Sequence, residues 1–187
     1  MCGIFGVISS PSTSCSKQEF IELAQRLLRL SETRGRESSG IAIINLAGSE
    51  RTLLKAPVPA SRFIRTSRFK KLLSSPPLRP ERSEKQASTA IIGHTRLVTN
   101  GKEDDNHNNQ PVTGEGGVLV HNGILVNIDE LWAKQRETLE RRFDVDSEYL
   151  LVRIDQLFIG GLELHEAVRQ TFLEIRGAAS IAFVPSR

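Results

Sequence analysis

The chain has 187 residues, a hydrophobic content of 39%, a charged content of 25% and a formal net charge of +3. This length suffices for one domain with a sizeable core, and the composition is typical of a soluble globular protein. No apolar run approaches the roughly 20 residues that cross a bilayer, and the N-terminus lacks a signal peptide. Two cysteines are too few for a disulfide framework. We therefore expect a cytoplasmic protein without membrane association.

The first half of the chain contains the most secure helix. Residues 3–9 are apolar and partly β-branched and end at Ser-Ser-Pro, which predicts a short buried strand. Ser16 and Glu19 have the spacing of a capping box. Apolar residues then recur at helical spacing and predict a helix over 17–32. We expect this helix to stop near Gly35, because glycine can take a positive φ there.

Further elements follow from the same patterns. Short strands are expected over residues 40–44, 51–56, 89–95 and 117–121, and a final strand over residues 178–184. Helices are expected over residues 60–73, 146–159 and 163–175, with Asp146 or Ser147 as the cap of the second. Residues 74–88 contain three prolines and many polar residues, which predicts a mobile loop. Residues 100–116 are also expected to be loop. Because strands and helices occur in groups, the pattern favours an α+β fold.

Basic residues concentrate between residues 51 and 82, which raises the question of a nucleic-acid partner. Phe63 and Phe69 are the only aromatic residues of that stretch that could stack on bases. A solvated basic face is the preferred interpretation, and a docking surface for a protein partner is the intermediate one. Nucleic-acid binding is therefore not expected.

The second residue is a cysteine, which becomes N-terminal if Met1 is removed. Cys2 would then carry both a thiol nucleophile and a free α-amino group, whose ordinary pKa of roughly 7.7–8.0 suits proton transfer near neutral pH. A nucleophile activated by the N-terminal amine is a known catalytic scheme. Alone, however, a cysteine at this position is weak evidence for catalysis.

Acyl transfer through a cysteine also needs oxyanion donors and groups that hold the substrate. The side-chain amide of Asn122 and the backbone amide of Gly123 could form a two-donor oxyanion hole, although Asn-Gly is also a common turn. Arg96 ends a strand and could bind a carboxylate through two hydrogen bonds, or form a surface ion pair. Asp146 could bind an ammonium group, or simply cap a helix.

No metal or other cofactor is expected. The four histidines lack the tight spacing of metal ligands along the sequence. These histidines are His94, His107, His121 and His165.

Together these motifs resemble the glutaminase domain of class II glutamine amidotransferases, which are N-terminal nucleophile hydrolases. The similarity covers essentially the whole chain, and the order of the motifs makes it specific. The motifs occupy residues 1–6, 34–42, 93–96, 109–111, 121–124, 146–148 and 176–180. The resemblance implies a four-layer αββα sandwich. Because domains of this family usually continue through further strands, it also implies that the chain is a fragment, a compact stand-alone form or one subunit of a split enzyme.

The resemblance implies a role for each matching residue. Cys2 would attack the side-chain amide of glutamine, with its own amine as the base, and Asn122 and Gly123 would stabilise the oxyanion. Arg96 would bind the α-carboxylate of glutamine and Asp146 its α-ammonium group. The family's matching positions also include Thr99, which would line the glutamine pocket, and Arg34, which would support the site near Cys2.

The acceptor of the ammonia is left open by the sequence. Leu97 matches asparagine synthetases, whereas sugar-aminating members carry Trp there and phosphoribosyl members Tyr. Thr99, Gly101 and residues 121–124 resemble the sugar-aminating type, but Asn100 replaces a histidine often found in it. The expected partners are L-glutamine and a synthase domain or subunit that accepts ammonia. Self-association into a homo-oligomer is left open.

Two other functions remain as alternatives. The chain could be a catalytically silent regulatory module that binds glutamine through Arg96 and Asp146 without turnover. It could also be a nucleic-acid-binding protein centred on residues 60–82. The presence of Cys2, Asn122 and Gly123 together favours the enzyme over both.

Overall fold

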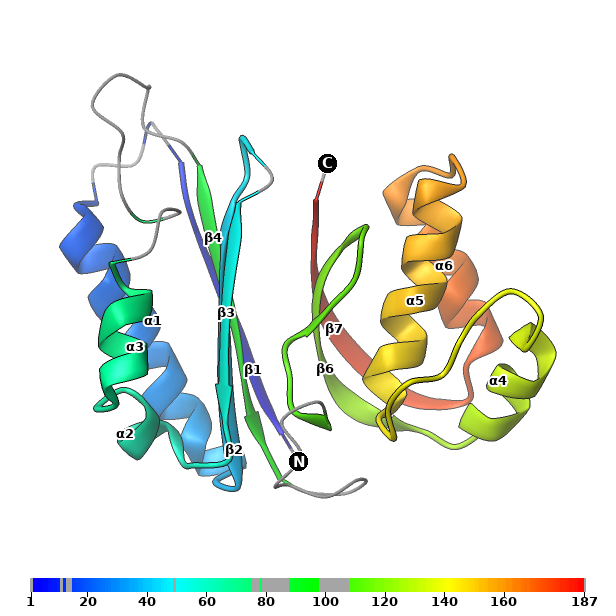
Figure 1. The fold of residues 1–187 in the computed structure, drawn as a ribbon, viewed down its shortest axis with the longest axis horizontal. Helices are drawn as coiled ribbons and strands as arrows, with labels where there is room; N and C mark the ends of the chain where they lie inside the picture. The colour runs from blue at the N-terminus through cyan, green and yellow to red at the C-terminus, as the bar shows by residue number, and fades with distance from the viewer. Residues whose placement is uncertain are drawn as a thin grey trace.

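Two antiparallel sheets face each other and are enclosed between two layers of helices (Figure 1). The computed structural model describes residues 2–10, 12, 15–48, 50–74, 78, 88–97 and 108–186. The first sheet has the strand order β1-β4-β2-β3 and the second β5-β6-β7. The strands are β1 (Gly3–Ser9), β2 (Ser38–Asn45), β3 (Arg51–Ala56), β4 (Thr89–Arg96), β5 (Val112–Thr113), β6 (Gly117–Leu125) and β7 (Gly177–Pro185). This is the αββα sandwich that the family resemblance implied, and it agrees with the α+β class that the residue pattern predicted.

One layer of helices covers each outer face (Figure 1). The first sheet is covered by α1 (Lys17–Ser31), α2 (Ala60–Phe63) and α3 (Ser67–Leu72), with a 3₁₀ turn, η1 (Glu32–Arg34), after α1. The second sheet is covered by α4 (Ile128–Gln135), α5 (Asp146–Ile159) and α6 (Leu164–Glu174). None of the described helices is long and apolar enough to cross a membrane.

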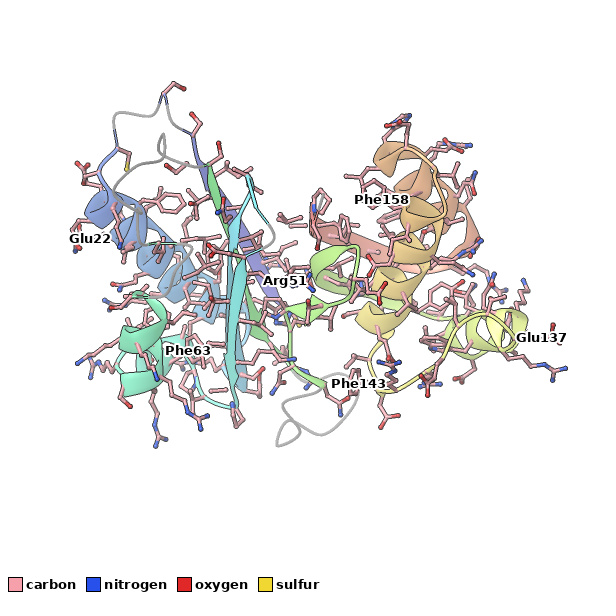
Figure 2. All side chains as sticks on the ribbon, turned by 45° about the horizontal axis from the view of Figure 1, so that its top comes forward. Glu22, Arg51, Phe63, Glu137, Phe143 and Phe158 are labelled. Atoms are coloured by element: carbon pink, nitrogen blue, oxygen red, sulfur yellow. The ribbon has the colours of Figure 1, made fainter. Side chains whose placement is uncertain are left out.

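Three apolar layers lie between the four layers of helices and strands. Side chains alternate along each strand, and this alternation decides into which apolar layer a residue packs. On β4, Ile91 packs toward α1–α3, whereas Ile92 packs between the sheets. On β6, Val120 packs between the sheets and Leu119 toward α5. Figure 2 shows Phe63 among the side chains of the first helix layer, where it is fully buried. The same alternation therefore shows which face of the sheet a functional side chain at the end of a strand occupies.

Polar contacts also join the layers. Arg51 on β3 donates from Nη1 to Ser186 Oγ at 3.0 Å, and Figure 2 shows Arg51 on the side of the first sheet that faces the second. On α5, Asp155 is buried, and its Oδ2 accepts a hydrogen bond from the Gly116 amide at 3.0 Å. Its Oδ1 has no hydrogen-bond partner in the described part of the chain. Burial raises the pKa of the Asp155 carboxyl to about 6.

Most predicted elements of the first half are confirmed. Helix α1 begins after Ser16, whose capping box with Glu19 is formed. The predicted end of this helix is correct, but the reason given for it is wrong. Gly35 is extended, with φ −172°. A side chain there would instead meet the backbone of Arg96 and Leu97, so glycine is needed for close approach.

Other predictions needed revision. The single helix expected over 60–73 is two short helices, because Thr66 starts a new helix by accepting a hydrogen bond from the Phe69 amide. Helix α4 was not predicted. Residues 146–159 are helical as predicted, but neither Asp146 nor Ser147 is the cap, since Val145 occupies that position without a side-chain bond. The predicted mobile loop, residues 74–88, lies mostly outside the described residues.

Candidate functional site

Cys2 lies at the head of β1, where β1 pairs with the end of β4. Gly3 is opposite Thr95 in this ladder, so Cys2 reaches the peptide of Leu97. The Cys2 Sγ accepts a hydrogen bond from the Leu97 amide at 3.4 Å, and the thiol can donate to the Leu97 carbonyl at 3.5 Å. Arg34 Nε donates to the Cys2 carbonyl at 3.0 Å. Both the thiol and the backbone of Cys2 are therefore held by the protein.

Two glycines make this close packing feasible. A Cβ at Gly3 would lie 2.6 Å from Thr95 Oγ1 and 2.8 Å from the Ser31 carbonyl, and one at Gly35 would lie 2.6 Å from the Leu97 nitrogen. Real Cβ atoms essentially never approach that closely. The end of α1, the η1 turn and the end of β4 therefore come together around Cys2. A hollow of about 460 Å³ adjoins this point and is lined by Thr33, Arg34, Gly35, Arg36, Glu37 and Leu97.

Arg96 is buried at the end of β4, on the same strand face as Ile92, which packs between the sheets. Its Nη1 donates to Asn109 Oδ1 at 2.8 Å. His94, two residues earlier on this face, is fully buried, and neither ring nitrogen has a hydrogen-bond partner among the described residues. Burial, with the nearby charge of Arg96, lowers the pKa of His94 to about 3. Arg96 is thus the cation next to a neutral imidazole.

Asn122 and Gly123 lie on β6, in the facing sheet. Alternation places the Asn122 side chain on the same face as Val120, toward the first sheet. The backbone at Gly123 is tightly enclosed, since a Cβ there would meet the Ala178 carbonyl and lie 2.7 Å from His121 Nε2. Only glycine fits at this position without a shift of β7 or of the His121 ring.

Asp146 is the first residue of α5 and lies at the end of β6. Its Oδ2 accepts a hydrogen bond from the Leu125 amide at 3.2 Å, and its Oδ1 is 3.4 Å from His121 Nδ1. Burial opposes ionisation of Asp146, but the interactions with His121 and the backbone amides outweigh it. They hold the pKa of the carboxyl below its ordinary value. Asp146 is therefore an anion at neutral pH.

Strand faces and direct contacts show how most of the predicted site residues lie relative to one another. By strand alternation Arg96 and Asn122 both face the space between the sheets, and Cys2 precedes the strand whose Ile4 packs there. Arg34 contacts Cys2 directly, whereas Asp146 is linked to β6 through His121 and Leu125. Thr99 lies outside the described residues, as do Met1, Asn100 and His107. No group of three or more potential metal ligands occurs in the described part of the chain.

Sequence reasoning missed the residues that hold the predicted ones. Asn109 contacts Arg96, Gln110 contacts the backbone of His121, and the His121 ring contacts Asp146. The motif at residues 109–111 was a signal for the first two, although its order along the chain does not reveal what it contacts.

An αββα sandwich with a cysteine at the head of β1, the edge strand of one of the two inner sheets, is the architecture of N-terminal nucleophile hydrolases. No family model matches the chain. The chain is 31% identical to glutamine–fructose-6-phosphate aminotransferase (isomerizing) of Bradyrhizobium diazoefficiens, over 98% of this chain and 26% of that protein. It is 30% identical to the enzyme of the same name from Bacillus subtilis, over 97% and 26% of the two chains. The chain is homologous to the glutaminase domains of class II glutamine amidotransferases.

Solved structures have the same fold. The glutamine phosphoribosylpyrophosphate amidotransferase of B. subtilis, in complex with ADP and GMP, superposes with a TM-score of 0.66 at 22% identity, over 99% of this chain and 35% of that one. A structure described as the allosteric regulatory enzyme of purine biosynthesis gives 0.67 at 24% identity, over 99% and 36%. The chain thus spans about a quarter of the length of the curated relatives it matches and about a third of these structures.

Proposed function

We propose that the chain is a single glutaminase domain that hydrolyses the side-chain amide of L-glutamine to glutamate and ammonia. The observation that carries this proposal is the position of Cys2. Its thiol accepts a hydrogen bond from the Leu97 amide, and the preceding residue is the buried cation Arg96. A thiol held in a fixed position at a sheet end, beside a group that can bind a carboxylate, fits an amino-acid amide substrate.

In the proposed reaction the Cys2 thiol loses its proton to the α-amino group exposed by Met1 removal, and the sulfur attacks the amide carbon of glutamine. The oxyanion that forms would accept hydrogen bonds from Asn122 and from the Gly123 amide. The C–N bond then breaks, and the amine returns the proton to the leaving ammonia. Water hydrolyses the glutamyl thioester by the same steps in reverse order, and glutamate leaves.

Substrate binding would use the buried Arg96 and the partly buried Asp146. Arg96 would bind the α-carboxylate, because its planar guanidinium matches a carboxylate. Asp146, which stays ionised, would bind the α-ammonium group. Thr99 is proposed to line the same pocket.

Beyond glutamine, we propose that a synthase domain or partner subunit uses the ammonia. The relatives' name couples glutamine to fructose 6-phosphate, so a sugar phosphate is the first acceptor to test. We further propose that the protein acts in the cytoplasm, where a reducing environment keeps Cys2 as a thiol.

A glutaminase assay on protein whose intact mass shows Met1 removal tests the proposal. We expect wild type to release ammonia, and Cys2→Ala and Cys2→Ser to be inactive, because a hydroxyl is far less ionisable than a thiol. Activity in Cys2→Ala would refute the mechanism. Glutamine binding without turnover in processed wild type would instead support the regulatory module.

A further inference from the structure

The segment 108–111 is buried although residues 109–111 belong to neither a helix nor a strand. Asn108, Asn109 and Gln110 are 5%, 0% and 8% exposed. A buried irregular segment must find partners for its polar groups, because each unpaired group is costly. The partners of Asn109 and Gln110 lie in two different sheets.

Gln110 is tied to the second sheet. Its side-chain Nε2 donates to the His121 carbonyl at 2.9 Å, and its Oε1 accepts a short hydrogen bond from the His121 amide. One primary amide therefore satisfies both backbone groups of one residue, as a neighbouring strand would. That residue directly precedes Asn122 and Gly123, the proposed oxyanion donors.

Asn109 is tied to the first sheet. Its Oδ1 accepts from Arg96 Nη1 at 2.8 Å, and its backbone carbonyl accepts from Lys55 Nζ on β3 at 2.7 Å. The next carbonyl, that of Gln110, lies directly over Gly40 on β2, where a Cβ would collide with it. The segment thus packs against the first sheet while the Gln110 side chain reaches the second.

We propose that Asn109 and Gln110 are positioning residues that together form a brace across the site. Asn109 fixes the guanidinium of Arg96 for the α-carboxylate of glutamine. Gln110 fixes β6 at His121, and with it the oxyanion donors, at a set distance from Arg96. This inference rests on the proposed glutaminase function. It names the residues that hold the carboxylate-binding Arg96 and the oxyanion donors in position relative to each other.

The two residues act on different kinetic constants. Arg96 would bind the α-carboxylate equally in the ground state and the transition state, so disturbing it changes KM. The oxyanion donors act on charge that develops only in the transition state, so disturbing them changes kcat. We expect Asn109→Ala to raise KM about tenfold with kcat within threefold of wild type. We expect Gln110→Met, which keeps the side-chain length, to lower kcat about 10- to 100-fold with little change in KM.

Asn108→Ala is the matched control. Asn108 is equally buried and accepts a hydrogen bond from the Asp144 amide at 3.2 Å, so its loss should also cost stability. It is not part of the brace, and we expect its kcat and KM to stay within twofold of wild type. Similar kinetic losses in Asn108→Ala and Gln110→Met would overturn the proposal, because the effect would then be general destabilisation.

A double variant tests whether Asn109 acts through Arg96. In an Arg96→Lys background, adding Asn109→Ala should raise KM less than twofold further, since the guanidinium it orients is gone. A full additional tenfold increase would show that Asn109 acts by another route. If Gln110→Met fails to fold, Gln110→Glu tests the same brace, because it keeps the acceptor for the His121 amide and loses the donor for the His121 carbonyl.

Amide hydrogen exchange separates failure of the brace from failure of the glutaminase proposal. Gln110→Met should accelerate exchange at His121 in the free protein, whereas Asn108→Ala should not, whether or not wild type hydrolyses glutamine. Unchanged exchange at His121 in Gln110→Met would refute the brace itself. Absence of glutaminase activity in processed wild type, with exchange altered as expected, would refute only the function on which the kinetic argument rests.

Discussion

Gly35→Ala tests the close packing between Gly35 and the peptide that joins Arg96 to Leu97, which lies next to the proposed nucleophile. Gly35 is extended, so alanine can adopt its backbone conformation without strain. The added Cβ would nevertheless lie 2.5 Å from the Arg96 carbonyl oxygen and 2.6 Å from the Leu97 nitrogen. These atoms are backbone and cannot rotate away, so the end of β4 must move by about 1 Å to reach ordinary van der Waals contact at 3.4 Å.

The size of the effect follows from this displacement. Overpacking of a well-packed region costs typically about 1–3 kcal/mol of stability. The moving peptide is the one that holds Cys2 Sγ, and a misplacement of about 1 Å can reduce turnover about 10²-fold. We therefore expect Gly35→Ala to lose about 2 kcal/mol in urea unfolding. In the ammonia-release assay we expect kcat to fall about 10- to 100-fold.

Gly6→Ala is the matched control, because it makes the same substitution in β1, the strand that follows Cys2. A Cβ at Gly6 would lie 3.5 Å from Ile92 Cγ2, an ordinary contact. Alanine also restricts the unfolded chain, so this variant should be neutral or stabilised by up to about 1 kcal/mol, with unchanged activity. Equal stability and activity of the two variants would refute the steric argument.

Three further predictions concern single groups. Asn122→Ala should lower kcat by roughly 10²–10³, the usual loss for one oxyanion donor, and an effect on KM alone in steady-state assays would point to ground-state binding instead. Arg96→Lys should raise KM for glutamine, because an ammonium cannot reproduce the planar fork, and an unchanged KM would remove Arg96 from substrate binding. In wild type the free energy of unfolding should fall as pH rises from about 4 to 6, because native Asp155 holds its proton more tightly than the unfolded chain does. Asp155→Asn should abolish that dependence and be more stable above pH 6 by up to about 3 kcal/mol, and parallel pH profiles in urea unfolding would contradict the assignment.

Local signals in the sequence predicted local structure well. The capping box of Ser16 and Glu19 places the start of α1 correctly, because both partners of its bonds lie within one turn. The strand limits of β1 and β3 are also correct, since apolar runs ended by turn residues define them. Helix α4 was missed because it has only 8 residues and buries Leu131 and Trp132, so its apolar pattern is too short to show a helical period.

Features that depend on distant contacts could not be read locally. Gly35 was assigned a positive φ, but its real constraint is the backbone of β4, some sixty residues away. Asp146 reads as a helix cap from its neighbours, whereas its carboxylate bonds the Leu125 amide at the end of β6. The bonds of Asn109 and Gln110 likewise join segments whose proximity only the fold creates.

The pairing of β1 with β4 has a consequence for the maturation of the enzyme. Gly3 pairs with Thr95, so the first strand of the nascent chain has no ladder partner until roughly 90 more residues have been made. At about 5–20 residues per second this takes about 5–18 s. During that interval the Met1–Cys2 bond belongs to an unpaired chain end, open to a processing peptidase. The topology thus provides a time window in which the Met1–Cys2 bond is accessible before Arg34 and Leu97 contact Cys2.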